Sequence, residues 1–145
     1  MDMKRIAIGT IVGAVTYFVA GYLIFEVGTA DFYAENLGSA TGLYRDAPLQ
    51  WAIALGCLSL AALITLGVET RGTPTIAAGV IAGAIVGFLV WLGVDFTRYG
   101  NANAWNLTLT IVDPLLELIR GGITGAVIAA VLVRVPKSTV NRSVA

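Results

Sequence analysis

The last apolar segment of the chain carries polar and charged residues at helical spacing. At 100° per residue, four of them fall within a sector of roughly 60° of a helix: Asp113, Glu117, Arg120 and Thr124. Arg120 lies roughly 10 Å further along the helix axis than Asp113, and its three-residue spacing from Glu117 allows a direct ion pair. Ionisable groups in such a segment are costly in lipid, so we expect this face to point into a helical bundle.

Two interpretations of this face remain open. In the first, it lines a polar pocket in the outer half of a membrane protein, together with Asp95 and Arg98, and binds or conducts a small solute or ion. In the second, it is an internally paired network that fixes helix register, or a pairing site for another subunit. In both cases we expect the polar face to meet Asp95 or Gln50.

Two aspartates suggest a third chemistry. Asp95 and Arg98 are expected to end the third apolar helix, so that Asp95 and Asp113 bracket an external loop at 97–112. The pair resembles the carboxylate dyad of lipoprotein signal peptidases, in which one acid shares a proton with the other and activates water. The Asn-x-x-Asp-Arg stretch of that family is absent here. We expect no enzyme activity and keep a membrane hydrolase as the last alternative.

Composition restricts the class of protein. The chain has 145 residues, no net charge, 57% hydrophobic residues and 12% charged residues, whereas soluble domains carry about 25% charged residues. This argues against a soluble globular domain, a disordered chain and a nucleic-acid-binding protein, which needs a basic face. Histidine is absent and Cys57 is the single cysteine. These counts exclude imidazole metal sites, His-dependent nucleophiles and an intrachain disulfide, and we predict no cofactor or metal.

Four segments of 20 residues are long enough, as helices, to cross about 30 Å of hydrocarbon. They span residues 6–25, 49–68, 75–94 and 114–133. Pro48, Thr73-Pro74 and Pro114 lie where the last three should begin, since proline suits the first turn of a helix. The sequence therefore predicts an all-α, four-helix transmembrane bundle that forms a single domain over residues 1–145.

Basic residues predict the orientation of this bundle. With the N-terminus inside, six of them lie on the cytoplasmic side and two on the outer side. The six are Lys4, Arg5, Arg71, Arg134, Lys137 and Arg142, and the two are Arg45 and Arg98. Both termini should therefore be cytoplasmic, and the protein should lie in the inner membrane. The alternative for the first segment is a cleaved signal peptide, although the segment is longer than the usual apolar region of such a peptide.

Glycines recur at four-residue spacing in the first and third segments. They are Gly9 and Gly13, followed by Gly79, Gly83 and Gly87. Small residues at this spacing let helix backbones approach closely, either within the chain or between subunits. The Gly-x-Ile-x-Gly-Ala-x-x-x-Phe pattern from Gly9 repeats seventy residues later from Gly79. This indicates two parallel helical hairpins, 1–70 and 71–140, unless the match reflects only the composition of membrane helices.

The external connection at 26–50 contains Phe32, Tyr33 and Leu37 at a spacing that predicts a short interfacial helix, broken by Gly38 and Gly42. It is either a lid over the outer pocket or a passive connector.

Several motifs resemble a group of small bacterial four-helix integral membrane proteins of unassigned activity. They are Asp31-Phe32-Tyr33, Gly38-Ser39-Ala40-Thr41-Gly42, the glycine-rich third segment and Asn106-Leu-Thr-x-Thr-x-Val-Asp113-Pro114. The resemblance covers nearly the whole chain and implies the same topology, but no activity. We expect membrane lipid as a partner, a homo-oligomer, and a pocket that binds or conducts a small solute or ion. The alternative is an accessory subunit that packs through its glycine faces against a larger membrane complex.

Overall fold

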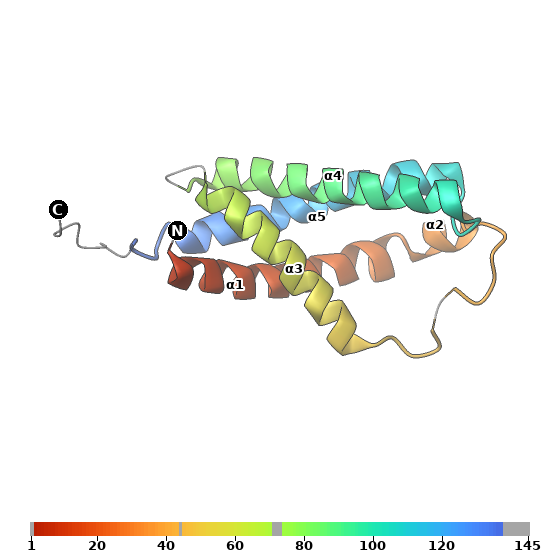
Figure 1. Ribbon diagram of the computed structural model, residues 1–145, viewed down its shortest axis with the longest axis horizontal. Helices are drawn as coiled ribbons and strands as arrows, with labels where there is room; N and C mark the ends of the chain where they lie inside the picture. The colour runs from red at the N-terminus through yellow and green to blue at the C-terminus, as the bar shows by residue number, and fades with distance from the viewer. Residues whose placement is uncertain (1, 44, 71–73, 138–145) are drawn as a thin grey trace.

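The computed structural model describes residues 2–43, 45–70 and 74–137. Four long helices dominate these residues (Figure 1). They are α1 (Met3–Gly21), which continues as the π-helical segment η1 (Tyr22–Gly28), α3 (Gln50–Glu69), α4 (Ile76–Asn101) and α5 (Leu107–Leu132). A short helix, α2 (Ala30–Glu35), lies between η1 and α3. The predicted all-helical class is confirmed for these residues.

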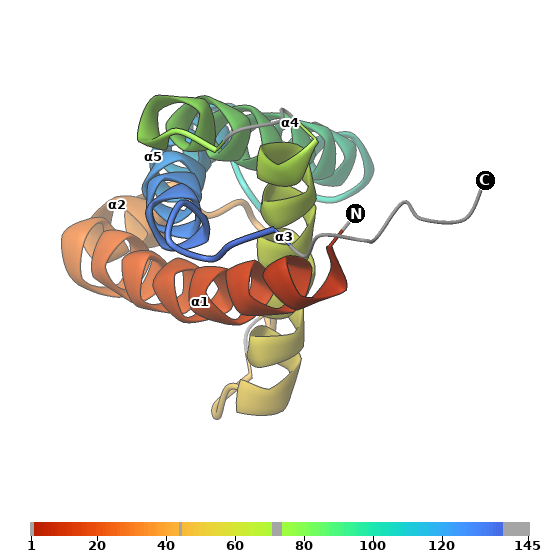
Figure 2. The ribbon, with the colours of Figure 1, turned by 90° about the vertical axis from the view of Figure 1, so that its left-hand side faces the viewer.

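The long helices run alternately in opposite directions, and α5 lies between α4 and α1 (Figures 1 and 2). The remaining long helix, α3, crosses the other three obliquely, and its first turns point away from them. Its buried residues, Cys57, Ala61, Ile64, Thr65 and Val68, all belong to its later turns. The end of the bundle near Gln50 is therefore more open than the opposite end.

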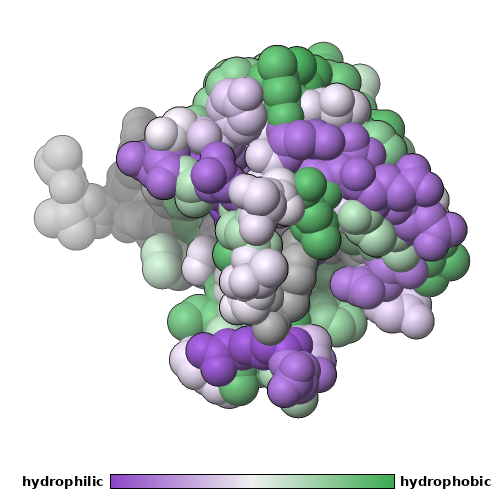
Figure 3. All heavy atoms as spheres, turned by 90° about the vertical axis from the view of Figure 1, so that its right-hand side faces the viewer, coloured by the Kyte–Doolittle hydropathy of each residue, from purple (hydrophilic) through white to green (hydrophobic). Residues whose placement is uncertain are grey.

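All four long helices are long and apolar enough to cross a membrane. Large apolar side chains point outward along them, including Ile11, Leu89 and Ile119, each at least half exposed. Hydrophilic residues gather at the end of the molecule near α2 and are bordered by hydrophobic ones (Figure 3). This distribution suits a bundle whose sides face lipid and whose ends face water.

Glycine contacts join α4 to α5. A Cβ atom added to Gly83 would overlap the carbonyl oxygen of Gly121, and one on Gly79 would lie 2.6 Å from the Cβ of Ala129. Gly87 likewise meets the backbone of α5 at Glu117. The two backbones thus touch, which only glycine permits, and the close approach adds dispersion contacts between the helices.

The glycines of α1 also pack within the chain. A Cβ on Gly9 would lie 2.6 Å from Cγ2 of Thr65, and one on Gly13 would lie 2.6 Å from Cδ1 of Ile128. α1 therefore rests on both α3 and α5. All five glycines that the sequence singled out face neighbours in the same chain, which answers the question of intrachain or intersubunit packing for these surfaces.

The predicted start of the last helix at Pro114 is wrong. α5 begins seven residues earlier, at Leu107, where the Oδ1 atom of Asn106 accepts a hydrogen bond from the Leu109 N–H at 2.9 Å. Pro114 lies inside the helix and leaves the carbonyl of Thr110 without its usual donor. The first turns of α5 contain threonines and Asp113, which lower the local hydropathy, so the sequence hides the true start of the helix. In the structure Leu109, Thr110 and Asp113 are nevertheless buried.

The predicted end of the third helix is also wrong. α4 continues beyond Asp95 and Arg98 to Asn101, so the expected loop at 97–112 shrinks to 102–106. Burial of Asp95 explains the error, because a polar residue suggests a helix end only when it faces water. Thr75, not Thr73, caps α4, and its hydroxyl accepts from the Ala78 N–H at 3.1 Å. Thr73, Arg71 and Arg142 lie outside the described residues.

Two connections at the end of the molecule near α2, which we call the outer end, are joined to each other. The Gly38 N–H donates to the carbonyl of Ala104 at 2.8 Å, and the Ala40 N–H donates to that of Asn103 at 2.9 Å. The side-chain amide of Asn106 donates to Asn36 at 2.9 Å. We call the paired segments 36–40 and 102–106 the outer clasp. The predicted short helix is present as α2, which contains Phe32 and Tyr33 but ends at Glu35, before Leu37. The clasp ties α2 to the turn between α4 and α5.

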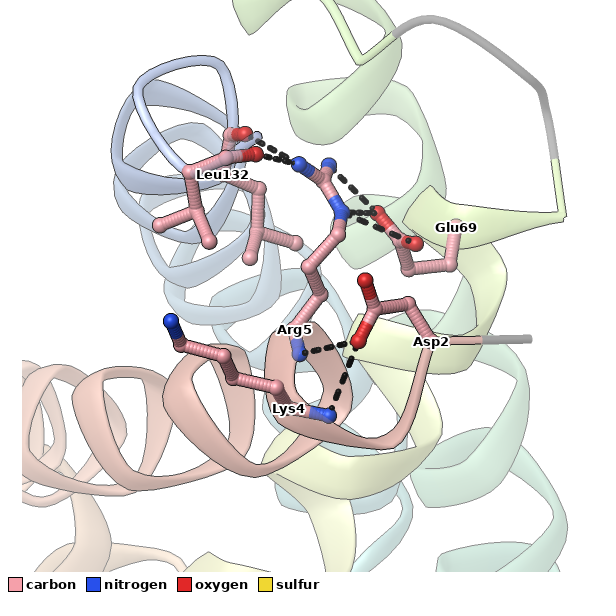
Figure 4. A network of polar contacts seen from close by, with 6 residues as sticks. Asp2, Lys4, Arg5, Glu69 and Leu132 are labelled. Atoms are coloured by element: carbon pink, nitrogen blue, oxygen red, sulfur yellow. Dashed lines mark hydrogen bonds and ion pairs between the residues drawn. The ribbon is translucent and has the colours of Figure 1, made fainter. Parts of the chain in front are cut away.

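At the opposite end, Arg5 joins three helices (Figure 4). Its guanidinium donates to Glu69 on α3, with an Nη2–Oε1 distance of 2.8 Å, and to the carbonyl of Leu132 at the end of α5, also at 2.8 Å. The side chains of Arg5 and Glu69 are 3% and 6% exposed. The sequence assigned Arg5 only to the basic inner surface, whereas the fold buries it as a cross-link.

Candidate functional site

A buried ion pair lies near the middle of α5. The Nη1 atom of Arg120 donates to Oε1 of Glu117 at 2.8 Å, as their three-residue spacing predicts. The second carboxylate oxygen of Glu117 accepts a hydrogen bond from the phenol of Tyr17 on α1. Glu117 is only 2% exposed, so both of its oxygens have donors where water has little access.

The Arg120 guanidinium also bonds to the backbone and ring of Tyr17. Its Nε donates to the carbonyl oxygen of Tyr17 at 2.8 Å, and its Cζ lies 3.7 Å from the centroid of the Tyr17 ring. Gly21 makes this approach possible, because a Cβ there would overlap the guanidinium. The α-helical part of α1 ends at Gly21 and the π-helical register follows. Arg120 therefore packs where the register of the first helix changes.

Trp91 on α4 completes the set. Its indole N–H donates to the hydroxyl oxygen of Tyr17 at 3.2 Å. We call Tyr17, Trp91, Glu117 and Arg120 the central network, which connects three helices and contains one positive and one negative charge. The attraction between the two charges and their additional hydrogen bonds offset part of the cost of placing ions inside the bundle.

Two aspartates meet above this network. Asp95 on α4 is fully buried and Asp113 on α5 is 4% exposed. Their carboxyl groups lie close enough for a hydrogen bond between them. Both oxygens of Asp95 and the Oδ2 atom of Asp113 lack an N–H or O–H donor among the described residues. We call Asp95 and Asp113 the aspartate pair.

The fourth carboxylate oxygen of the aspartate pair, Oδ1 of Asp113, has a donor on the short helix α2. The phenol of Tyr33, on α2, donates to Oδ1 of Asp113. Burial, followed by this hydrogen bond, raises the pKa of Tyr33 well above its ordinary value. Tyr33 therefore remains a protonated donor at any physiological pH, and it fixes α2 over the aspartate pair.

Arg98 lies at the edge of this site. Its Nη1 is 3.9 Å from Oδ1 of Asp95, too far for a hydrogen bond, and its side chain is 38% exposed. The guanidinium instead lies 4.3 Å from the ring centroid of Trp105, which belongs to the outer clasp. The contact of Arg98 with Asp95 is therefore electrostatic only and is partly screened by solvent.

A groove opens beside the central network, between the outer part of the first helix and the start of α3. Its volume is about 380 Å³, and Arg120 lines it together with Gln50 and Glu26. Apolar walls come from Phe18, Phe25 and Ile53. The groove exists because α3 diverges from the bundle there, and it offers both donors and acceptors beside an apolar surface.

The structure brings together most of the polar residues that the sequence selected, but not all in one site. Glu117 and Arg120 join the central network, Asp95 pairs with Asp113, and Arg98 stays at the rim. Thr124 is buried, yet its hydroxyl donates to the carbonyl of Arg120 in its own helix at 2.9 Å. Its position on the polar face therefore reflects a backbone contact.

Three aromatic residues of the site were missed by sequence reasoning: Tyr17, Tyr33 and Trp91. Each lies in an apolar or interfacial segment where aromatic residues are common, so its type carries little information. A signal was available for Tyr17 and Trp91, since a phenol or an indole N–H within an apolar helix needs a hydrogen-bond partner.

No protein-family model matches this chain, and no curated protein or solved structure matches it either. The resemblance to small bacterial four-helix membrane proteins therefore stays a prediction. The function of the chain has to be inferred from the site itself, because a helical bundle supports many functions.

Proposed function

We propose that this chain is a non-enzymatic inner-membrane protein that binds a small solute in the groove beside Arg120. The observation that carries the proposal is the position of Arg120 between a buried carboxylate and an open groove. A charged side chain within a membrane segment is costly, and such residues commonly mark binding sites or transport pathways. A purely structural ion pair has no need of an adjoining groove.

The groove chemistry supports a solute with one polar and one apolar part. Arg120 and Gln50 supply donors, whereas Phe18, Phe25 and Ile53 supply an apolar wall. Glu117 already neutralises Arg120, and Glu26 is the other charged residue of the lining. The site therefore disfavours an anion, and a neutral or zwitterionic solute suits it. Solute binding here occurs at the outer interface, from which conduction across the bundle would start.

Native mass spectrometry of the protein released from membrane vesicles tests this proposal. We expect a small molecule to remain bound to the wild-type protein. Ile53→Trp, which fills the groove, should abolish that bound mass. The matched control is Ile123→Trp, which fills an apolar groove of about 390 Å³ on α1 and α5 and should leave the bound mass unchanged. A ligand retained by Ile53→Trp, or absent from the wild-type protein, would contradict the proposal.

The orientation and assembly belong to the same proposal. Lys4, Arg134 and Lys137 lie at the end where α1 begins and α5 ends, which supports cytoplasmic termini by the positive-inside rule. The α1–α3 and α4–α5 pairs correspond to the two suggested hairpins. We propose a homo-oligomer, and the same mass spectra would report its subunit number.

The glycine contacts within the chain weigh against the alternative of an accessory subunit. That alternative required the glycines of α1 and α4 to dock against a partner, and these glycines already contact neighbours within the chain. A larger membrane protein would have to dock on the lipid-facing side chains instead. Recovery of the chain with a different, larger partner after gentle detergent extraction would favour this alternative over the homo-oligomer.

A further inference from the structure

The aspartate pair has an unusual balance of donors and acceptors. Three of its four carboxylate oxygens lack an N–H or O–H donor among the described residues, and the fourth accepts from Tyr33. The two carboxyl groups lie within hydrogen-bonding reach of each other. A hydrogen bond between two carboxyl groups forms only when one of them carries a proton, because two carboxylates offer only acceptors.

We infer that Asp95 and Asp113 form a proton-binding site, in which a single proton is held between the two carboxyl groups. The proton lies on Asp95, whose oxygens have no other donor, and is donated to Oδ2 of Asp113. The hydroxyl of Tyr33 already donates to Oδ1 of Asp113, so Oδ2 is the oxygen of Asp113 that is left to accept this proton. This inference goes beyond the proposed solute site, since neither aspartate lines the groove beside Arg120.

The charged and titratable groups around the pair do not replace this proton. On α4, Arg98 is 3.9 Å from Asp95 and lies over Trp105. On α5, Glu117 adds a further acid, which Arg120 and Tyr17 satisfy. From α2, the phenol of Tyr33 supplies one donor to one oxygen. Without the added proton, two buried carboxylates would face each other with one distant cation, an arrangement that like-charge repulsion disfavours.

A proton fits the site better than a metal ion. Among the described residues, no group of three or more Asp, Glu, His or Cys side chains could hold a metal. Two carboxylates by themselves provide too few contacts for Ca²⁺ or Mg²⁺, which take six or more oxygen ligands. A monovalent cation such as Na⁺ remains the rival occupant, and the experiment below distinguishes it from a proton.

Loss of the proton should act on the outer clasp. Tyr33 connects the aspartate pair to α2, and Trp105 connects Arg98 to the paired segments of the clasp. Two negative charges in place of one would push Asp95 and Asp113 apart or draw water to them. Because the clasp covers this end of the bundle, we expect its hydrogen bonds to open more often as pH rises.

Infrared spectroscopy of the protein in vesicles of ether-linked lipid, which has no ester carbonyl groups, tests the inference directly. A protonated carboxyl group gives a C=O stretching band that carboxylates lack. We expect the wild-type protein to retain this band at neutral pH, when exposed acids are ionised, and to lose it at higher pH. Asp95→Asn should remove the band while its amide donates to Asp113, whereas Asp31→Asn, at an exposed position on α2, should leave it unchanged.

Three results would overturn the inference. The first is a wild-type spectrum without the band at neutral pH. The second is a band that survives Asp95→Asn but disappears in Glu117→Gln, which would assign the proton to the central network. The third is a spectrum that changes with added NaCl at constant pH and ionic strength, which would identify a sodium site. If Asp95→Asn does not fold, the wild-type titration, together with Glu117→Gln, still decides the question. A missing solute in the groove would leave all of these outcomes unaffected.

Discussion

Tyr17 donates a hydrogen bond to Glu117 across a separation of 100 residues. Its ring meanwhile lies beneath the guanidinium of Arg120, and its backbone carbonyl accepts from the same guanidinium. A single side chain on the first helix therefore holds both members of the ion pair on the last one. Hydrogen bonding to the charged form stabilises the Glu117 carboxylate where water has little access.

Tyr17→Phe should destabilise the bundle while keeping its packing. The substitution retains the ring under Arg120 but leaves the second oxygen of Glu117 without a donor and the Trp91 N–H without an acceptor. Unsatisfied buried groups cost about 1–3 kcal/mol each. The midpoint of unfolding in a detergent titration should decrease, whereas Tyr99→Phe, at an exposed tyrosine of α4, should leave it unchanged. Equal midpoints for the two variants would contradict the network.

The same substitution at two glycines of α4 should have opposite effects. In Gly83→Ala the new methyl group overlaps the carbonyl of Gly121, so the helices must separate, at a cost of about 1–3 kcal/mol. In Gly93→Ala the methyl group meets no atom within 4 Å, and the higher helix propensity of alanine should stabilise the protein by about 0.5–1 kcal/mol. Thermal unfolding in detergent measures both. A neutral Gly83→Ala would show that α4 and α5 pack less closely than described.

Arg5→Met should be among the most destabilising changes at the end of the bundle opposite α2. Removing one partner of a buried ion pair costs about 3–5 kcal/mol, because Glu69 is left charged and unpaired. The double variant Arg5→Met with Glu69→Leu should recover part of that loss. Lys4→Met, at the exposed neighbouring residue, is the control and should have little effect. A double variant no more stable than Arg5→Met would indicate that the bonds to the end of α5 dominate instead.

Asn106→Ala should loosen the outer clasp. Asn106 caps α5 through Leu109 and donates to Asn36, and loss of an N-cap alone costs about 1 kcal/mol. Amide hydrogen exchange should accelerate at Gly38 and Ala40, whose N–H groups donate across the clasp. The control is Asn103→Ala, because Asn103 contributes its backbone carbonyl to the clasp and keeps it. Unchanged exchange at Gly38 would show that the clasp does not depend on Asn106.

Much of the fold could be predicted because its causes are local. Hydropathy over about 20 residues sets the existence of the four long helices, and helical periodicity sets the pairing of Glu117 with Arg120. The ends of α4 and α5 could not be predicted in the same way. Aspartate is common in loops, which led the prediction to place Asp95 and Asp113 at helix ends. Both lie inside helices, where they are buried against each other.

The sequence by itself determined an all-helical chain with four apolar helices, a short outer helix and a polar face on the last long helix. Only the tertiary structure decided what that face meets: Tyr17 and Trp91 for Glu117 and Arg120, and Asp95 with Tyr33 for Asp113. It also decided that glycines contact glycines and that Arg5 is buried against Glu69. The reason is that helix formation depends on neighbours in sequence, whereas contacts between helices depend on crossing geometry, which changes when a few small residues allow two backbones to touch.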